Sequence, residues 1–195
     1  MTTTRLSRLT LALLATLSLG LTAAAQSGGD STEAFVPDPE GARDTLYTEI
    51  TRIGPNDWSI NVSYFTDVEV FAASVPLKFT AGLRRVVVDS TIFTGGAAEH
   101  FQVKTARPDT AIQCVTIGLI AALSPNGKPL APGKGRLGTV FLHAQGDGAA
   151  PALVVDTTTT HPENSLMFVK QNWTTNKQTK IYPAYVPTSS EKAKK

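Results

Sequence analysis

The stretch Trp58-Ser59-Ile60-Asn61-Val62-Ser63-Tyr64 decides the fold class. Apolar residues occupy every second position and polar residues stand between them, which is typical of a β-strand with one buried face. The shared parity of Trp58 and Tyr64 predicts that both rings point into the core and not onto the surface. Residues 46–53 alternate less regularly, and the Gly-Pro-Asn-Asp sequence at 54–57 can form a tight turn between the two segments.

Short extended segments continue along the rest of the chain. No window after the first 25 residues shows the apolar stripe of an amphipathic helix, and turns rich in Gly and Pro separate the apolar runs. We therefore predict an all-β fold, an antiparallel β-sandwich of the jelly-roll type with about nine or ten strands. The remaining strands are expected at residues 68–79, 86–93, 101–104, 112–123, 137–145, 153–157, 165–170 and 181–186.

Two of these strands carry more specific expectations. Pro76 lies inside segment 68–79 and has no N–H for a ladder, so this strand is expected at a sheet edge or bent at the proline. Segment 112–123 is almost continuously apolar, which predicts a central strand covered on both faces. It contains the single cysteine, Cys114, which we expect to be a buried apolar side chain.

The N-terminus has the pattern of a signal peptide at residues 1–25. Arg5 and Arg8 precede an apolar run at 9–21, and small residues end at Ala25, where the peptide would be cleaved. The apolar run is shorter than the ~20 residues that span a bilayer as a helix, although an uncleaved anchor stays an alternative. We expect an exported protein, periplasmic or extracellular, with no membrane span after cleavage.

Composition divides the remainder into three parts. Residues 26–43 are small, polar and rich in Gly and Pro, which predicts a flexible leader. Residues 44–187 form the expected sandwich domain, and residues 188–195 a disordered tail.

The charge balance bears on the class of partner. The chain has 18 Lys and Arg residues against 16 Asp and Glu residues, and the predicted cleavage removes two arginines and no acids. A neutral mature chain lacks the surplus of positive charge that phosphate backbones require, so nucleic acid is not an expected partner.

No catalytic, metal-binding or cofactor-binding motif is evident. The G-x-S-x-G pattern of hydrolases is absent, and the histidines lack the spacing of zinc ligands, so we predict neither an enzyme nor a bound cofactor. A structural calcium site stays open, because acidic residues near Asp44 and Asp147 could supply oxygen ligands. The three histidines are His100, His143 and His161.

Trp173 is the one residue predicted to contact a ligand. It lies in the polar stretch Gln-Asn-Trp-Thr-Thr-Asn at residues 171–176, so we expect its ring to be exposed. An exposed indole offers a broad apolar surface with one polar edge.

Three motifs, taken in order, resemble those of a known family. They are Val-Pro-Leu-Lys-Phe at 75–79, Val-Asp-Ser-Thr-Ile-Phe at 88–93, and Leu-Ala-Pro-Gly-Lys-Gly-Arg-Leu-Gly-Thr-Val-Phe at 130–141. The chain resembles the cohesin-like domains of exported bacterial proteins over residues 45–186. That resemblance implies a nine-stranded jelly roll, shared with carbohydrate-binding modules, which binds a protein partner such as a dockerin through one sheet face. It implies no individual contact residue.

Two functions lead as hypotheses, and an enzyme, which would need a cleft with convergent polar groups, stays a third. The first is a secreted, non-catalytic, cohesin-like module that binds a protein partner in an extracytoplasmic assembly. The second is a carbohydrate-binding module associated with polysaccharide breakdown. Coplanar exposed aromatic rings on a sheet face would favour the second, and an aliphatic and polar face would favour the first.

Overall fold

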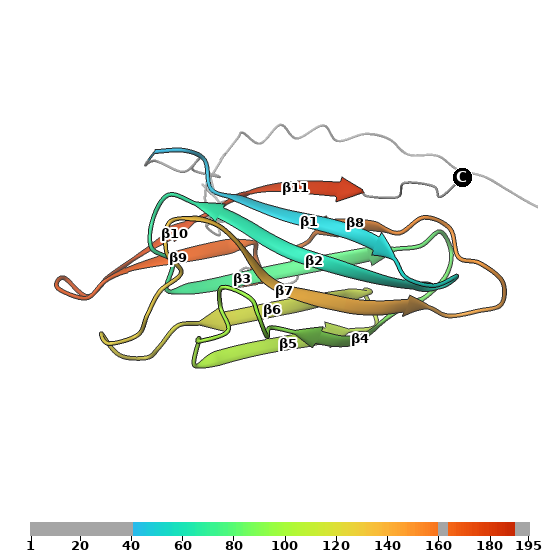
Figure 1. Ribbon diagram of the computed structural model, residues 1–195, viewed down its shortest axis with the longest axis horizontal. Coiled ribbons are helices and arrows are strands. Elements are labelled where there is room, and N and C mark those ends of the chain that lie inside the picture. The colour runs from blue at the N-terminus through green and yellow to red at the C-terminus, as the bar shows by residue number, and fades with distance from the viewer. Residues whose placement is uncertain (1–40, 160–163, 190–195) are drawn as a thin grey trace, which may run out of the picture. The chain divides into compact units, whose positions relative to one another are not determined.

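The computed structural model describes residues 41–159 and 164–189. These residues form eleven β-strands and no α-helix, which confirms the all-β prediction (Figure 1). The strands are β1 Thr45–Arg52, β2 Asp57–Thr66, β3 Ala72–Thr80, β4 Val86–Ile92, β5 Val103–Asp109, β6 Cys114–Ile120, β7 Gly133–Ala144, β8 Val154–Thr157, β9 Met167–Asn172, β10 Lys177–Ile181 and β11 Ala184–Ser189.

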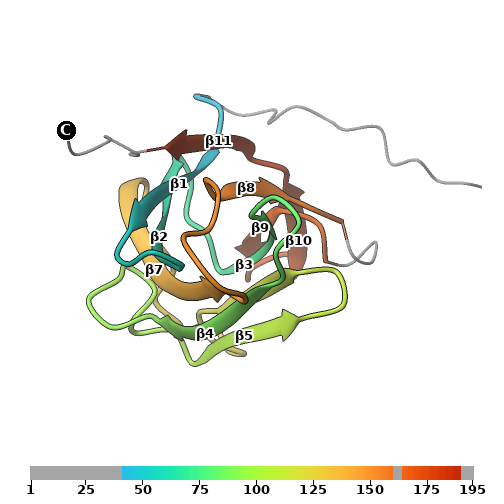
Figure 2. The ribbon, with the colours of Figure 1, turned by 90° about the vertical axis from the view of Figure 1, so that its right-hand side faces the viewer.

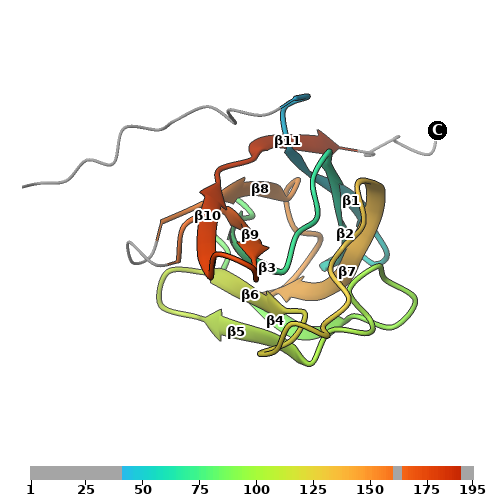
Figure 3. The ribbon, with the colours of Figure 1, turned by 90° about the vertical axis from the view of Figure 1, so that its left-hand side faces the viewer.

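The strands form two sheets that face each other as a sandwich. One has five strands in the order β11-β1-β2-β7-β4, and the other has β10-β9-β3-β6-β5 with β8 also paired to β3, six strands in all. Views along the strands show the two layers around a common interior (Figures 2 and 3). All pairs are antiparallel as predicted except β1 with β11, which run parallel at the edge of the five-stranded sheet.

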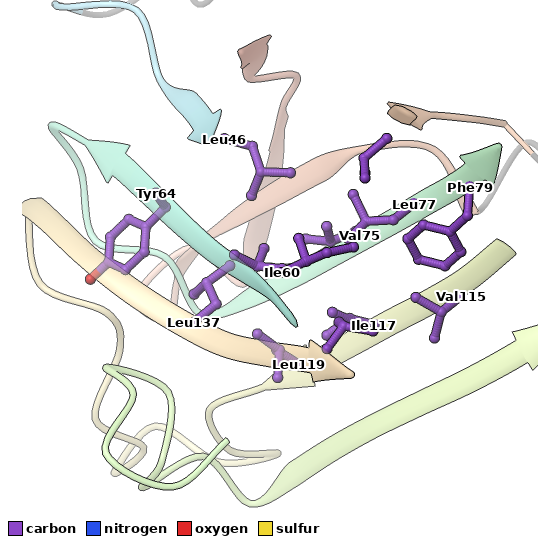
Figure 4. Packing of buried hydrophobic residues seen from close by; sticks show 14 of the residues in the cluster. Leu46, Ile60, Tyr64, Val75, Leu77, Phe79, Val115, Ile117, Leu119 and Leu137 are labelled. Carbon is purple, nitrogen blue, oxygen red and sulfur yellow. The ribbon is translucent and has the colours of Figure 1, made fainter. Parts of the chain in front are cut away.

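The core lies between the sheets and is built from alternate residues of their strands. Val75 and Leu77 of β3 and Ile117 of β6 point toward Ile60 and Leu137 of the other sheet (Figure 4). Each of these side chains is no more than 1% exposed. Fully burying such a side chain contributes ~1.5–3 kcal/mol, so the interior supplies the main stabilisation.

The prediction that the rings of Trp58 and Tyr64 point into the core is confirmed. Trp58 is 0% and Tyr64 is 4% exposed. The ring of Tyr64 meets that of Phe168 edge to face, with centroids 6.5 Å apart, so it joins the two sheets. Neither ring is available to a ligand at the surface.

The expectation of an edge position for Pro76 is wrong. β3 pairs with β6 on one side and with β8 and β9 on the other, and its register with β6 runs through the proline without a shift. The carbonyl of Pro76 accepts a bond from Thr158 N on the β8 side. The missing N–H faces that same side, where the pairing of β3 passes from β9 to β8. A central strand tolerates the proline because no ladder bond is required there.

The strand count and the C-terminal boundary also differ from expectation. β10 was not predicted, because Lys177, Gln178, Thr179 and Lys180 are all exposed and give no apolar alternation. β11 continues to Ser189, so residues 188 and 189 pair with β1 and do not belong to a disordered tail. The predicted signal peptide, most of the leader and residues 190–195 lie outside the described residues.

Hydrogen bonds join the two sheets along both margins of the sandwich. Tyr185 of β11 donates its hydroxyl to Val155 O at 2.9 Å and lies 2.7 Å from Thr48 Oγ1. On the other margin, Gln113 Oε1 accepts a bond from Val86 N at 2.7 Å. Polar contacts between the layers therefore complement the apolar core.

Candidate interaction surface

β6 is covered on one face only. Its inward residues Val115, Ile117 and Leu119 are buried, whereas Thr116, Gly118 and Ile120 are half-buried on the outer face. The prediction of cover on both faces is therefore wrong. The sequence is apolar throughout because outward apolar residues such as Ile120 alternate with the inward ones. Apolar residues on the outer face of β6 indicate that this face is a candidate interaction surface.

The outer positions of four neighbouring strands form a groove of about 720 Å³. At one end its lining is aliphatic. The strand registers place Val169 of β9, Ala72 of β3, Ile120 of β6 and Val103 of β5 in one row across the sheet. Met167 lies on the next row. This aliphatic row, at the ends of β3, β5 and β6, provides apolar area that a partner can cover.

Small residues line the centre of the groove and leave its floor open. Ser74, Gly118 and Thr105 occupy the row beside the aliphatic one. A Cβ placed on Gly118 would lie 2.8 Å from Thr105 Oγ1, so a larger residue there would disturb Thr105. Thr105 Oγ1 also donates to Gly118 O at 3.3 Å. The glycine therefore keeps the floor of the groove open.

The other end of the groove is polar. Arg107 and Asp109 of β5 line it together with Cys114 of β6. Asp109 Oδ1 accepts the N–H of Ala111 at 2.9 Å and so shapes the turn between β5 and β6.

Cys114 is buried, as predicted, with an exposed fraction of 2%. Burial raises the pKa of its thiol, and the negative charge of Asp109 adds to this rise. The thiol is therefore protonated and poorly nucleophilic at neutral pH.

Trp173 lies in the turn between β9 and β10, outside the lining of the groove. Its ring is half-buried and meets Phe71 edge to face at 6.0 Å, so the expectation of an exposed ring is wrong. Its polar sequence neighbours occupy the turn while the ring packs against the end of the sheet. Within the described residues its indole N–H has no acceptor. A role in ligand binding stays a prediction.

The outer face of the five-stranded sheet has a different character. Thr139 Oγ1 donates to Asn61 Oδ1 at 2.9 Å and accepts a bond from Arg136 Nη1 at 3.0 Å. His143 Nδ1 and Asp89 Oδ1 lie 2.7 Å apart. Polar groups on this face therefore bond to each other.

Three half-buried aromatic residues, Tyr47, Phe65 and Phe141, lie on the outer face of the five-stranded sheet. Tyr47 and Phe141 are half-buried, and each has a serine opposite it on β2, Ser63 and Ser59 respectively. Tyr47 and Phe141 are not cross-strand neighbours of each other. Phe65 of β2, half-buried on the same face and opposite Thr45, lies diagonally beside Tyr47 of β1.

The positions considered for metal binding lie apart from one another. His100 Nε2 contacts Lys128 O at 2.8 Å, whereas His143 is paired with Asp89, and His161 lies outside the described residues. Asp44 is fully buried and accepts a bond from Thr66 Oγ1 at 3.1 Å. In the part of the chain that the structure describes, no three His, Cys, Asp or Glu side chains gather as metal ligands. Among the described residues there is no helix that is long and apolar enough to cross a membrane.

Comparison with known proteins shows which solved structures have a similar fold. No family model matches the sequence, and no curated protein matches it. The sixth cohesin of scaffoldin B from Acetivibrio cellulolyticus, solved in complex with a mutant Cel5 dockerin, aligns with a TM-score of 0.54 at 8% identity, over 76% of this chain and 98% of that chain. The chain has a cohesin-like fold.

Two further solved structures are similar to the cohesin-like domain. The CaDoc0917–CaCohA2 complex aligns with a TM-score of 0.50 at 12% identity, over 75% of this chain and 97% of that chain. The seventh ScaB type I cohesin from Pseudobacteroides cellulosolvens gives a TM-score of 0.49 at 9% identity, over 76% of this chain and 92% of that chain. The two structures with TM-scores of 0.54 and 0.50 confirm the resemblance at the level of the fold.

Proposed function

We propose that this cohesin-like domain is a non-catalytic module that binds a protein partner in the groove on the open face of the six-stranded sheet. The observation that supports the proposal most is the aliphatic row across β9, β3, β6 and β5. Apolar side chains on an open sheet face lose contact with water when a partner covers them, and this burial favours association.

A dockerin module is the proposed class of partner, because the sixth cohesin from Acetivibrio cellulolyticus, whose fold this chain shares, was solved with a dockerin. The signal-peptide pattern at residues 1–25 supports a setting outside the cytoplasm. Trp173 stays a proposed secondary contact because its ring is only half-buried at the turn between β9 and β10.

The proposal is tested with a matched pair of variants. Ser74→Trp places a large side chain in the groove, and Ser59→Trp places the same side chain on the outer face of the other sheet. Both serines are half-buried at outward positions of interior strands. Thermal unfolding first establishes that both variants fold.

The wild-type domain and both variants are then used for affinity capture from the secreted fraction of the source organism. We expect one protein to be retained by the wild type and Ser59→Trp and lost with Ser74→Trp. Retention by Ser74→Trp as well would contradict the proposal. A panel of polysaccharides is tested in parallel, and binding of a glycan that is lost in Trp173→Ala would support the carbohydrate-binding function.

A further inference from the structure

The three outward aromatic side chains of the five-stranded sheet are not part of the core. Tyr47, Phe65 and Phe141 are half-buried on its outer face. Other partly buried aromatic residues, such as Phe71 and Tyr185, pack against the core cluster, and these three are not among them. Packing of the core therefore does not account for the three rings, which offer apolar area to a ligand at the surface.

Two of the rings form an apolar corner near the start of β1 and the end of β2. Tyr47 and Phe65 are diagonal neighbours in the antiparallel register, a position from which aromatic side chains reach each other. Val186 of β11 pairs with Tyr47 on its other side and is 40% exposed. The corner therefore presents apolar side chains on three successive strands.

The third ring, that of Phe141 on β7, lies farther along the face. Phe141 is opposite Ser59 of β2, whereas Tyr47 is opposite Ser63. The register places Phe141 about 13 Å along the strands and about 10 Å across them from Tyr47. An extended ligand can therefore contact both the apolar corner and Phe141.

Hydrogen-bonding groups lie between the apolar corner and Phe141. Asn61 of β2 is opposite Glu49 of β1 and Thr139 of β7. Thr139 Oγ1 donates to Asn61 Oδ1 at 2.9 Å and accepts a bond from Arg136 Nη1 at 3.0 Å. This network orients the Asn61 amide with its N–H groups as donors, and the exposed Glu49 carboxylate is an acceptor.

The strands of the five-stranded sheet carry no net charge with His143 neutral. Their three basic residues, Arg52, Lys134 and Arg136, are balanced by three acidic residues, Glu49, Asp57 and Asp89. A polyanion therefore gains no net attraction from this sheet, and a neutral ligand matches its charge.

We propose that the outer face of the five-stranded sheet is a second binding site, for a neutral polysaccharide chain. The flat C–H face of a sugar ring stacks on Tyr47 and Phe65 at one end of the site and on Phe141 at the other. Sugar hydroxyl groups between these places bond to the Asn61 amide and the Glu49 carboxylate. The site lies on the opposite sheet from the groove, so this inference does not rest on the proposed function.

A sugar chain fits this face better than a protein surface does. A protein interface has an apolar centre surrounded by a polar rim. Here the polar row of Glu49, Asn61 and Thr139 occupies the middle, and the apolar corner and Phe141 lie on either side of it. A ligand that carries C–H faces and hydroxyl groups along its whole length satisfies both kinds of position.

The probes are neutral hexasaccharides from cellulose, xylan and mannan, together with the trisaccharide of each sugar. Titration calorimetry measures their dissociation constants for the wild type, Tyr47→Ala, Tyr47→Trp and Phe141→Ala. The control is Leu83→Ala, which removes a fully exposed apolar side chain from the loop between β3 and β4. Thermal unfolding first establishes that each variant folds, and Phe65→Ala replaces Tyr47→Ala if that variant does not.

We expect at least one hexasaccharide to bind with a dissociation constant below ~1 mM. Tyr47→Ala should weaken this binding about tenfold, whereas Tyr47→Trp, which keeps a ring, and Leu83→Ala should stay within about twofold of the wild type. Phe141→Ala should remove the advantage of the hexasaccharide over the trisaccharide, because the longer chain alone reaches both apolar places.

Three results would overturn the proposal. The first is that none of the neutral hexasaccharides binds. The second is that a hexasaccharide binds Tyr47→Ala as tightly as the wild type, and loss of its binding in Trp173→Ala would then assign the glycan to the turn between β9 and β10. The third is that Tyr47→Ala loses the captured protein partner and keeps the glycan, which would assign this face to a protein.

Discussion

The outer faces of the two sheets use their outward positions differently. On the five-stranded sheet, Asn61, Thr139 and Arg136 bond to one another, so the polar groups of the face are largely satisfied within the molecule. On the six-stranded sheet, Ile120 and Val169 lie in a groove with small residues around them. A sandwich requires only one apolar side per sheet. Outward aromatic residues such as Tyr47 and Phe141 also occur on the five-stranded sheet. The aliphatic row that lies in a groove is therefore what indicates a surface adapted to another molecule.

The largest expected effect separates the two sides of one strand. Ile117→Ala removes a buried side chain of β6 and should lower the free energy of unfolding by ~2–5 kcal/mol, because it leaves a cavity in the core. Ile120→Ala, on the outer side of β6, should cost less than about 1 kcal/mol. Chemical denaturation of both variants measures the difference. Equal losses would mean that the outer side of β6 is packed as tightly as the inner side.

A second prediction concerns the margins that hold the two sheets together. Tyr185→Phe removes a hydroxyl that contacts both layers, and should lower the free energy of unfolding by ~1–2 kcal/mol. Gln113→Ala should have an effect of similar size on the opposite margin, since Val86 N loses its acceptor. Urea titrations test both variants, and no change in either would show that the core alone joins the sheets.

The Tyr185 margin also predicts a pH dependence. Burial raises the pKa of Tyr185 above its ordinary value, whereas the bond from Thr48 lowers it to a lesser extent. The folded state then holds the phenolic proton more tightly than the unfolded state. This contribution is fully present below pH ~10 and is lost as the pH rises through the raised pKa. The alkaline loss of stability should be smaller in Tyr185→Phe, although Tyr64, whose pKa burial also raises, retains part of it. Identical alkaline unfolding curves for the two proteins would contradict this account.

The smallest expected effect concerns Cys114 at the polar end of the groove. Burial and the raised pKa of the thiol predict slow reaction with a disulfide reagent in the folded protein and rapid reaction after unfolding. A Ser63→Ala variant on the opposite face should leave this rate unchanged. Rapid labelling under native conditions would show that the groove opens beneath its surface residues.

Much of the fold could be predicted from the sequence because the alternation of Trp58, Ile60, Val62 and Tyr64 indicates a strand with one buried face. The same signal failed for β10, whose exposed polar residues have no reason to alternate. Pro76 was misassigned because the sequence does not show that two successive strands, β9 and β8, share one edge of β3. Such a junction depends on pairing between distant segments.

The candidate site was harder to predict than the fold. The run at 112–123 held the decisive signal, since its outward residues Gly118 and Ile120 interrupt the buried apolar positions with no charged side chain. A strand that is covered on both faces and a strand whose outer apolar face is exposed have the same continuous apolar sequence. Trp173 attracted attention because its neighbours are polar, but contact with Phe71 depends on a residue about a hundred positions away in the chain.

The most direct test of the central claim is hydrogen–deuterium exchange of the domain with and without its captured protein partner. If the partner binds in the groove, the amides of β5, β6 and β9, whose outward residues line it, should gain protection from exchange. The amides of β1, β2 and β7 should not change. Protection confined to β2 and β7 would place the partner on the five-stranded sheet and contradict the account.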